Sequence, residues 1–168
     1  MIADQMDAII HYFAEEKITG IFITILGVLS LLLACIFLFV IKYSFFKGMA
    51  IPLLTIGMMQ LVAGGFIYLR TPKDIIRVEN MVRLDPQKII TQELPRMQKV
   101  MDNFIIYRLI EMCLIALGLF LFIRYYNSTQ SFWKGFGLAL VIQATILLTA
   151  DWVAQQRGKE YVNYLITL

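Results

Sequence analysis

Residues 18–41 have the sequence ITGIFITILGVLSLLLACIFLFVI, a run of 24 residues without a charged side chain. As an α-helix this run is about 36 Å long, which is enough to cross the roughly 30 Å hydrocarbon core of a bilayer. Further apolar runs follow at 48–69, 104–123 and 132–154. The second run also lacks charged side chains, whereas each of the last two contains charged residues in its interior. The sequence therefore predicts four membrane-spanning segments.

The composition supports this interpretation. The chain has 168 residues, of which 60% are hydrophobic and only 16% are charged, whereas soluble domains average roughly 25% charged residues. Backbone groups in lipid must be satisfied within the spanning structure, and these runs are far longer than barrel strands of roughly 10 residues. Short loops join the first run to the second and the third to the fourth, which predicts two antiparallel hairpins. We expect an all-α membrane protein, a single polytopic domain of four spans.

The parts outside the spans are also expected to be helical. Residues 1–16 carry apolar side chains at helical spacing, which predicts an amphipathic segment that packs on the protein or extends the first span. Residues 71–103 contain three prolines, and Thr71-Pro72 and Asp85-Pro86 both resemble helix starts. We expect this connection to form two amphipathic helices that cap one side of the spans. One side of the first helix would carry Ile75, Ile76, Glu79 and Val82, and an apolar stripe on the second would consist of Ile90, Leu94, Met97, Met101 and Phe104. Residues 155–168 form a C-terminal tail.

The charges are distributed unevenly between the two sides. Four spans place both termini and the long connection on one side, which carries eleven of the fifteen lysines and arginines. Because cytoplasmic loops carry an excess of Lys and Arg, this bias favours a cytoplasmic capped side. We expect a multi-pass protein of a cell membrane, with the bacterial inner membrane as its location.

Glu111 is the residue with the strongest functional signal. It lies inside the third span, one helical turn after Arg108, where a charged side chain costs roughly 2.5–3.5 kcal/mol on insertion scales. Asp151 lies near the end of the fourth span, so the two carboxyls are expected at the same membrane depth. Arg70 ends the second span on that side. These four residues are predicted to form a polar mouth, which is either a ligand pocket or an ion-pair clasp that fastens the helices.

Other polar residues give milder signals. Glu93 and Arg96 flank Pro95 in the cap, where such a cluster is more often a capped helix turn than a site. Gln60 and Gln143 lie deep in the second and fourth spans, and interhelical hydrogen bonds explain them well. A transport path lined by these residues is the alternative, although the intramembrane charges stop on the capped half.

The sequence contains no catalytic set, no metal-ligand spacing, no cofactor motif and no nucleic-acid surface. The first hypothesis is a non-enzymatic protein that binds a protein or lipid partner through its polar mouth and cap, with a homo-oligomer left open. It is similar in size and span count to immunity proteins against membrane-active toxins and to accessory subunits. The alternatives are an oligomeric transporter of a small solute or protons that uses Glu111 and Asp151, and an enzyme that modifies lipid headgroups.

Overall fold

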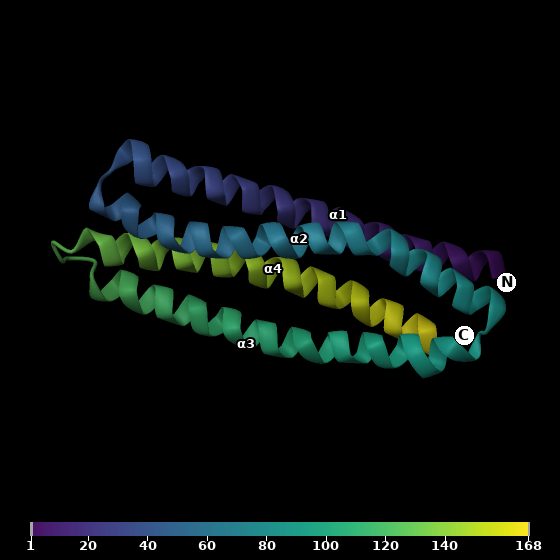
Figure 1. Cartoon of the computed structure of the whole chain (residues 1–168). Coiled ribbons are helices and arrows are strands. Elements are labelled where there is room, and N and C mark those ends of the chain that lie inside the picture. Colours follow the sequence, from purple (N-terminus) through teal and green to yellow (C-terminus); the bar gives the residue numbers. More distant parts are fainter. Residues whose placement is uncertain (1, 168) are drawn as a thin grey trace.

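The structure, a computed structural model that describes residues 2–167, is an elongated array of long helices (Figure 1). The helices are α1 (Ile2–Ile36), α2 (Ser44–Leu84), α3 (Leu94–Arg124) and α4 (Ser131–Thr167). Two π-helical turns, η1 (Phe37–Ile41) and η2 (Ile89–Glu93), follow α1 and precede α3. Within the described residues there is no strand, and four helices are long and apolar enough to cross a membrane. The predicted all-α fold with four membrane-spanning helices is confirmed.

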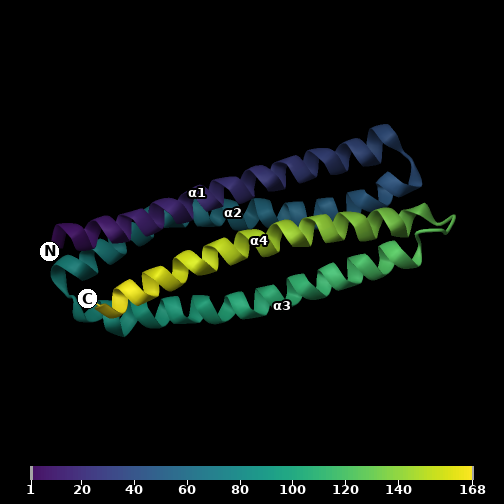
Figure 2. The ribbon, with the colours of Figure 1, turned by 180° about the vertical axis from the view of Figure 1, so that it is seen from behind.

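The helices lie side by side in the order α1, α2, α4, α3, and both views show this arrangement (Figures 1 and 2). The central helices α2 and α4 pack against each other, α1 packs mainly on α2, and α3 packs mainly on α4. Both termini lie at the same end as the α2–α3 connection, and the two short loops lie at the other (Figure 2). The hairpin topology expected from the loop lengths is therefore present.

All four helices continue past their apolar segments and meet in a second packing unit. We call this unit the polar bundle; it comprises residues 2–17, 70–84, 89–103 and 155–167. Its core takes large side chains from every helix: Met6, Ile9, Phe13, Val78, Met81, Val82, Ile89, Met97, Tyr161 and Leu165. Phe13 is fully buried, and its ring lies edge-on to that of Tyr161 at 5.8 Å. The N-terminal segment therefore extends the first span and packs on the protein.

The connection differs in one respect from the sequence expectation. Thr71 and Pro72 do not start a helix but lie inside α2, which runs without a break to Leu84. Thr71 is fully buried and its hydroxyl donates to the Ile67 carbonyl at 2.7 Å. Burial of the α2 face thus outweighs the backbone donor that proline removes. The second expected start is present, since α2 ends before Asp85 and helix resumes after Pro86.

The buried faces of the connection agree with most of the expected stripes, since Val82 and Met97 are buried and Ile75, Leu94 and Met101 pack against the same core. They differ at Ile76 and Ile90. On α2 the buried side chains are Asp74, Val78, Met81 and Val82, whereas Ile76 is 60% exposed. In η2 the buried positions are Ile89 and Glu93, and Ile90 is exposed. A π-helical turn shifts the register of the face by one residue relative to a regular helix, so a stripe counted at α-helical spacing fails at Ile90 but holds at Met97 in α3. Residues 155–167, expected as a tail, continue α4.

The membrane part is packed differently. We call the segments 18–41, 48–69, 104–123 and 132–154 the apolar bundle. Its buried hydrophobic cluster consists of Ala34, Ala50, Leu53 and Ala139, and α3 contributes nothing to it. Gly48 of α2 and Gly135 of α4 lie against the Phe132 and Phe45 carbonyls of the facing helix, so neither position has room for a Cβ atom. Small residues of this kind let helix backbones approach closely in lipid.

Candidate functional site

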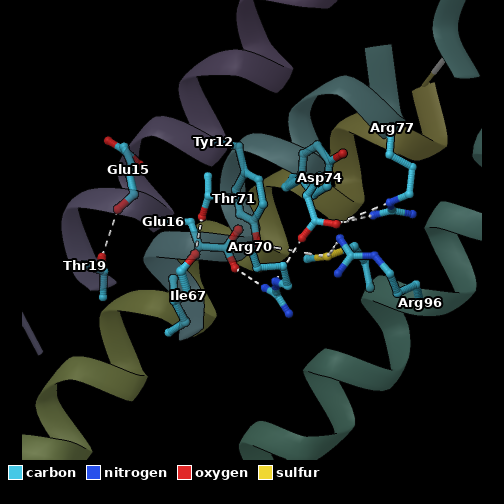
Figure 3. A network of polar contacts seen from close by, with 12 residues as sticks. Tyr12, Glu15, Glu16, Thr19, Ile67, Arg70, Thr71, Asp74, Arg77 and Arg96 are labelled. Carbon is cyan, nitrogen blue, oxygen red and sulfur yellow. Dashed lines mark hydrogen bonds and ion pairs between the residues drawn. The ribbon is translucent and has the colours of Figure 1, made fainter. Parts of the chain in front are cut away.

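The polar bundle contains a chain of alternating acidic and basic side chains that connects its helices. We call it the ion network; it comprises Glu16, Arg70, Asp74, Arg77, Glu93 and Arg96. Figure 3 labels all of these residues except Glu93. Arg70 binds Glu16 of α1 at 2.6 Å and Asp74 at 2.9 Å. Arg77 continues the chain from Asp74 at 3.2 Å. The network therefore joins α1 to α2 and extends onward to α3.

Glu93 is the most deeply buried charge of the network, with no exposed surface. Its carboxylate accepts two hydrogen bonds from Arg96, at 2.6 and 2.9 Å, and forms an ion pair with Arg77 at 2.9 Å. The Tyr161 hydroxyl of α4 donates to it at 3.4 Å. Glu93 precedes α3 at its N-terminus, but its side chain makes no capping bond. Its role is to connect three helices rather than to cap one.

Opposing effects act on the acids of the network. Burial alone would raise the pKa of Glu93, but hydrogen bonds and charges from Arg96 and Arg77 outweigh it and hold that pKa below its ordinary value. Burial raises the pKa of Glu16 above its ordinary value, and the adjacent Arg70 only partly offsets this effect. Burial and the negative charge of Glu93 raise the pKa of the Tyr161 hydroxyl, which therefore stays protonated as a donor. Glu93 is thus held ionised by its two cations.

The predicted mouth divides into two separate groups. Glu111 of α3 is 5% exposed and faces Asp151 of α4, with the two carboxyls within hydrogen-bonding reach. Arg108 also lies at the α3–α4 contact, where its guanidinium donates to the Gln155 side chain. Arg70 does not join them, because Glu16 and Asp74 bind it inside the ion network. The structure therefore brings together three of the four residues.

The deep glutamines meet across the apolar bundle. Gln60 of α2 donates to the Gln143 side-chain oxygen at 3.0 Å, and Gln143 of α4 donates to the Ser30 hydroxyl of α1 at 2.7 Å. All three side chains are buried. The two hydrogen bonds link α1, α2 and α4 near the middle of the membrane, while the Gln60 side-chain oxygen has no partner among the described residues.

A cleft of about 590 Å³ opens between α1 and α4 where the apolar bundle meets the polar bundle. Its walls are mostly apolar and include Phe22, Ile146 and Val153. At the polar end, Arg157 donates to the Glu15 carbonyl at 2.9 Å and to the Thr19 hydroxyl at 2.7 Å. The cleft therefore has an apolar length and ends at the ion pair of Arg157 with Glu15.

Glu16, Asp74 and Arg77 are the network members that sequence reasoning did not single out. Arg70, Asp74 and Arg77 follow one another at spacings of four and three, which places them on one face of a helix. That spacing was visible in the sequence. The pairing of Arg70 with Glu16 was not, because the two residues are 54 positions apart.

The polar groups described above form ion pairs and hydrogen bonds between the helices. Among residues 2–167 no three potential metal ligands of the His, Cys, Asp and Glu types lie together. The four long apolar helices and their polar ends define a small multi-pass integral membrane protein.

Comparison with known proteins adds no further assignment. No family model, no curated protein and no solved structure matches the chain. Its function is therefore argued from its own residues.

Proposed function

We propose that this membrane protein is non-enzymatic and holds a protein partner at the end of its polar bundle, as immunity-like proteins or accessory subunits do. The observation that carries the proposal is a set of large apolar side chains exposed far from the apolar bundle. Leu84 is 81% exposed, Ile90 59% and Ile166 63%. The end of α2, the turn η2 and the end of α4 lie at the same end of the molecule (Figures 1 and 2).

Lipid does not account for these side chains. Leu84 follows Arg70, at the end of the second apolar segment, by 14 residues of continuous helix, which corresponds to about 21 Å at 1.5 Å per residue. That distance carries the side chain beyond the headgroup layer of a bilayer whose polar regions add only about 5–8 Å on each side. An exposed apolar side chain in water is the kind of group that a protein partner covers. A partner surface of matching apolar character is therefore the favoured ligand.

The rigidity of the polar bundle supports the same proposal. The three exposed residues extend from helices whose opposite faces are fixed by the core and by Glu93. A docking surface on packed helices loses little conformational entropy when a partner binds. We place this surface in the cytoplasm of a bacterial cell, with the protein in the inner membrane, because the same end carries most of the Lys and Arg residues.

Site-specific photo-crosslinking in native membranes tests the proposal. A photoreactive residue at Leu84, Ile90 or Ile166 is expected to give the same discrete protein adduct, identified by mass spectrometry. Gln98 of α3 is the matched control, since it is exposed in the polar bundle but polar. Adducts to lipid alone at the three positions, or an equal yield at Gln98, would contradict partner binding there.

A lipid ligand is the second candidate, and the cleft between α1 and α4 is the observation that favours it. Its apolar walls suit an acyl chain, and the paired charges of Arg157 and Glu15 at its end suit a polar headgroup. Ala150→Trp fills the cleft, whereas Ala116→Trp on exposed α3 does not. Native mass spectrometry is expected to show a bound lipid that only Ala150→Trp removes. A lipid retained in Ala150→Trp would exclude this site.

A flux assay in proteoliposomes tests the alternative that the protein is a transporter. Proteoliposomes with the wild-type protein are expected to show no solute or proton flux above empty vesicles, because the deep polar side chains Ser30, Gln60 and Gln143 bond to one another. A flux that disappears in Glu111→Gln would place transport ahead of partner binding.

A further inference from the structure

The contact between α3 and α4 inside the membrane contains two acidic side chains that face each other. Glu111 lies seven residues into the segment 104–123, about 10 Å beyond its start at 1.5 Å per residue. It is 5% exposed, and its carboxyl lies within hydrogen-bonding reach of the Asp151 carboxyl. The Oε2 atom of Glu111 is buried and has no hydrogen-bond partner among the described residues. A buried carboxyl oxygen of this kind needs a hydrogen-bond donor.

No described side chain donates a hydrogen bond to this oxygen. In the apolar bundle α3 packs on α4 alone, so only these two helices can present charged groups to Glu111. Arg108 is the nearby cation, but its guanidinium donates to Gln155. Two ionised carboxyls that face each other in a buried contact would repel each other strongly, because water screens their charges poorly there. A pair without a bound ligand would therefore push α3 away from α4.

We propose that Glu111 and Asp151 form a proton-binding site, in which the two carboxyls share one proton that holds α3 against α4. The proton converts two facing acceptors into a donor and an acceptor, and a hydrogen bond between a carboxylic acid and a carboxylate is short and strong. The shared proton also removes one of the two negative charges from the membrane. The ligand is a proton that a carboxylate takes from hydronium, which leaves water, and the binding is reversible. This inference does not rest on partner binding.

The site explains how α3 stays attached inside the membrane. Another close contact there is at Gly118, where the backbones of α3 and α4 meet beside Gly137, and Arg108 adds a hydrogen bond to Gln155. The remaining side chains of the α3 segment are exposed or half-buried, and in a membrane the exposed ones face lipid. Loss of the proton is therefore expected to loosen α3 specifically, while α1, α2 and α4 stay joined through Ser30, Gln60 and Gln143.

Infrared spectroscopy of the purified full-length protein in lipid nanodiscs tests the site. At neutral pH the wild type is expected to show the carbonyl band of one protonated carboxyl, which shifts in deuterated water. Glu111→Gln and Asp151→Asn should each fold and lose this band, because the amide replaces the protonated partner as donor. Glu16→Gln is the control, since Glu16 is another partly buried acid, and it should keep the band.

A second measurement tests what the proton does. The thermal midpoint of the wild type should fall over the same pH range in which the infrared band of the protonated carboxyl disappears. A proton bound by the folded state stabilises that state only while it remains bound. Glu111→Gln should lack this component of the pH dependence. The proposal is overturned if the wild type shows no protonated carboxyl, if Glu16→Gln removes the band, or if Na⁺ abolishes it at constant pH.

Discussion

The polar bundle and the apolar bundle are built from the same four helices, yet they are packed in opposite ways. In the polar bundle every helix contributes large buried side chains, and an ion network joins α1, α2, α3 and α4 through Glu93 and its partners. In the apolar bundle the buried cluster contains three alanines and one leucine, and α3 lies outside it. The end in water is therefore the better packed of the two.

Solvent explains the difference. In water, burying large apolar side chains is favourable by roughly 25 cal/mol per Å², so the polar bundle gathers aromatic and aliphatic groups in one core. In lipid there is no such gain, because the tails are as apolar as the side chains. Helices there associate through small residues and hydrogen bonds, as at Gly135 and Gln143. Packing of the polar bundle therefore contributes more to the free energy of folding than packing of the apolar bundle.

The largest expected effect comes from a pair of matched phenylalanine substitutions. Phe13 is fully buried in the polar bundle, and Phe120 on α3 is 63% exposed. Phe13→Ala should lower the free energy of unfolding by about 3–5 kcal/mol, because it leaves a cavity in a tight core. Phe120→Ala should leave it nearly unchanged in lipid. Unfolding in nanodiscs measures both, and equal losses would break the distinction between the two bundles.

The next effect concerns the charge at the centre of the ion network. Glu93→Ala leaves Arg77 and Arg96 without their shared partner and should cost about 3 kcal/mol, the lower end of the range for breaking a buried pair. The lower end is appropriate because the side chains of Arg77 and Arg96 remain 34% and 27% exposed. Glu160→Ala, at an exposed position of the polar bundle, is the control. A loss at Glu93 no larger than that at Glu160 would show that the network contributes nothing.

Acid should weaken the same network. Because the pKa of Glu93 is lower in the folded state than its ordinary value of 4.5, its contribution is present above that value and is lost as the pH falls further. The thermal midpoint of Glu93→Gln should therefore decline less steeply than that of the wild type below this value. Parallel declines would assign the acid sensitivity to other carboxyls.

The smallest effect tests the apolar bundle. Gly135→Ala would force its new methyl group into the Phe45 backbone and should cost about 1–3 kcal/mol, the usual range for overpacking. Gly65→Ala is the matched control in α2, because its Cβ atom would meet nothing. That control should be neutral or stabilise the helix by up to about 1 kcal/mol. If both substitutions are neutral, α2 and α4 are not closely packed where Gly135 faces Phe45.

Much of the fold was predictable because apolar runs of this length form membrane-spanning helices in lipid. The four spans, the hairpins and the helix restart after Pro86 follow from residue types at known spacing. The continuous passage of α2 through Pro72 did not follow, since it depends on burial of Thr71, Val78 and Met81 against other helices. Local signals mark where a helix can start, but tertiary packing decides whether it does.

The site was predictable only in part. Glu111 and Asp151 were expected at one depth, and the structure places them face to face because α3 and α4 form a hairpin. Arg70 was grouped with them by depth alone, but it lies on a helix that does not pack on α3 in the membrane. Its actual partner, Glu16, comes from α1. Depth can be counted along a sequence, whereas the lateral order of helices cannot.

Hydrogen exchange in lipid nanodiscs is the most direct test of the packed polar bundle. Peptides covering residues 71–84 and 94–103 are expected to exchange slowly, like those of a folded core, although they lie outside the apolar segments. Phe13→Ala should accelerate exchange in these peptides and leave residues 48–69 unchanged. Exchange over 71–103 at the rate of an unstructured chain, in the wild type, would contradict the account.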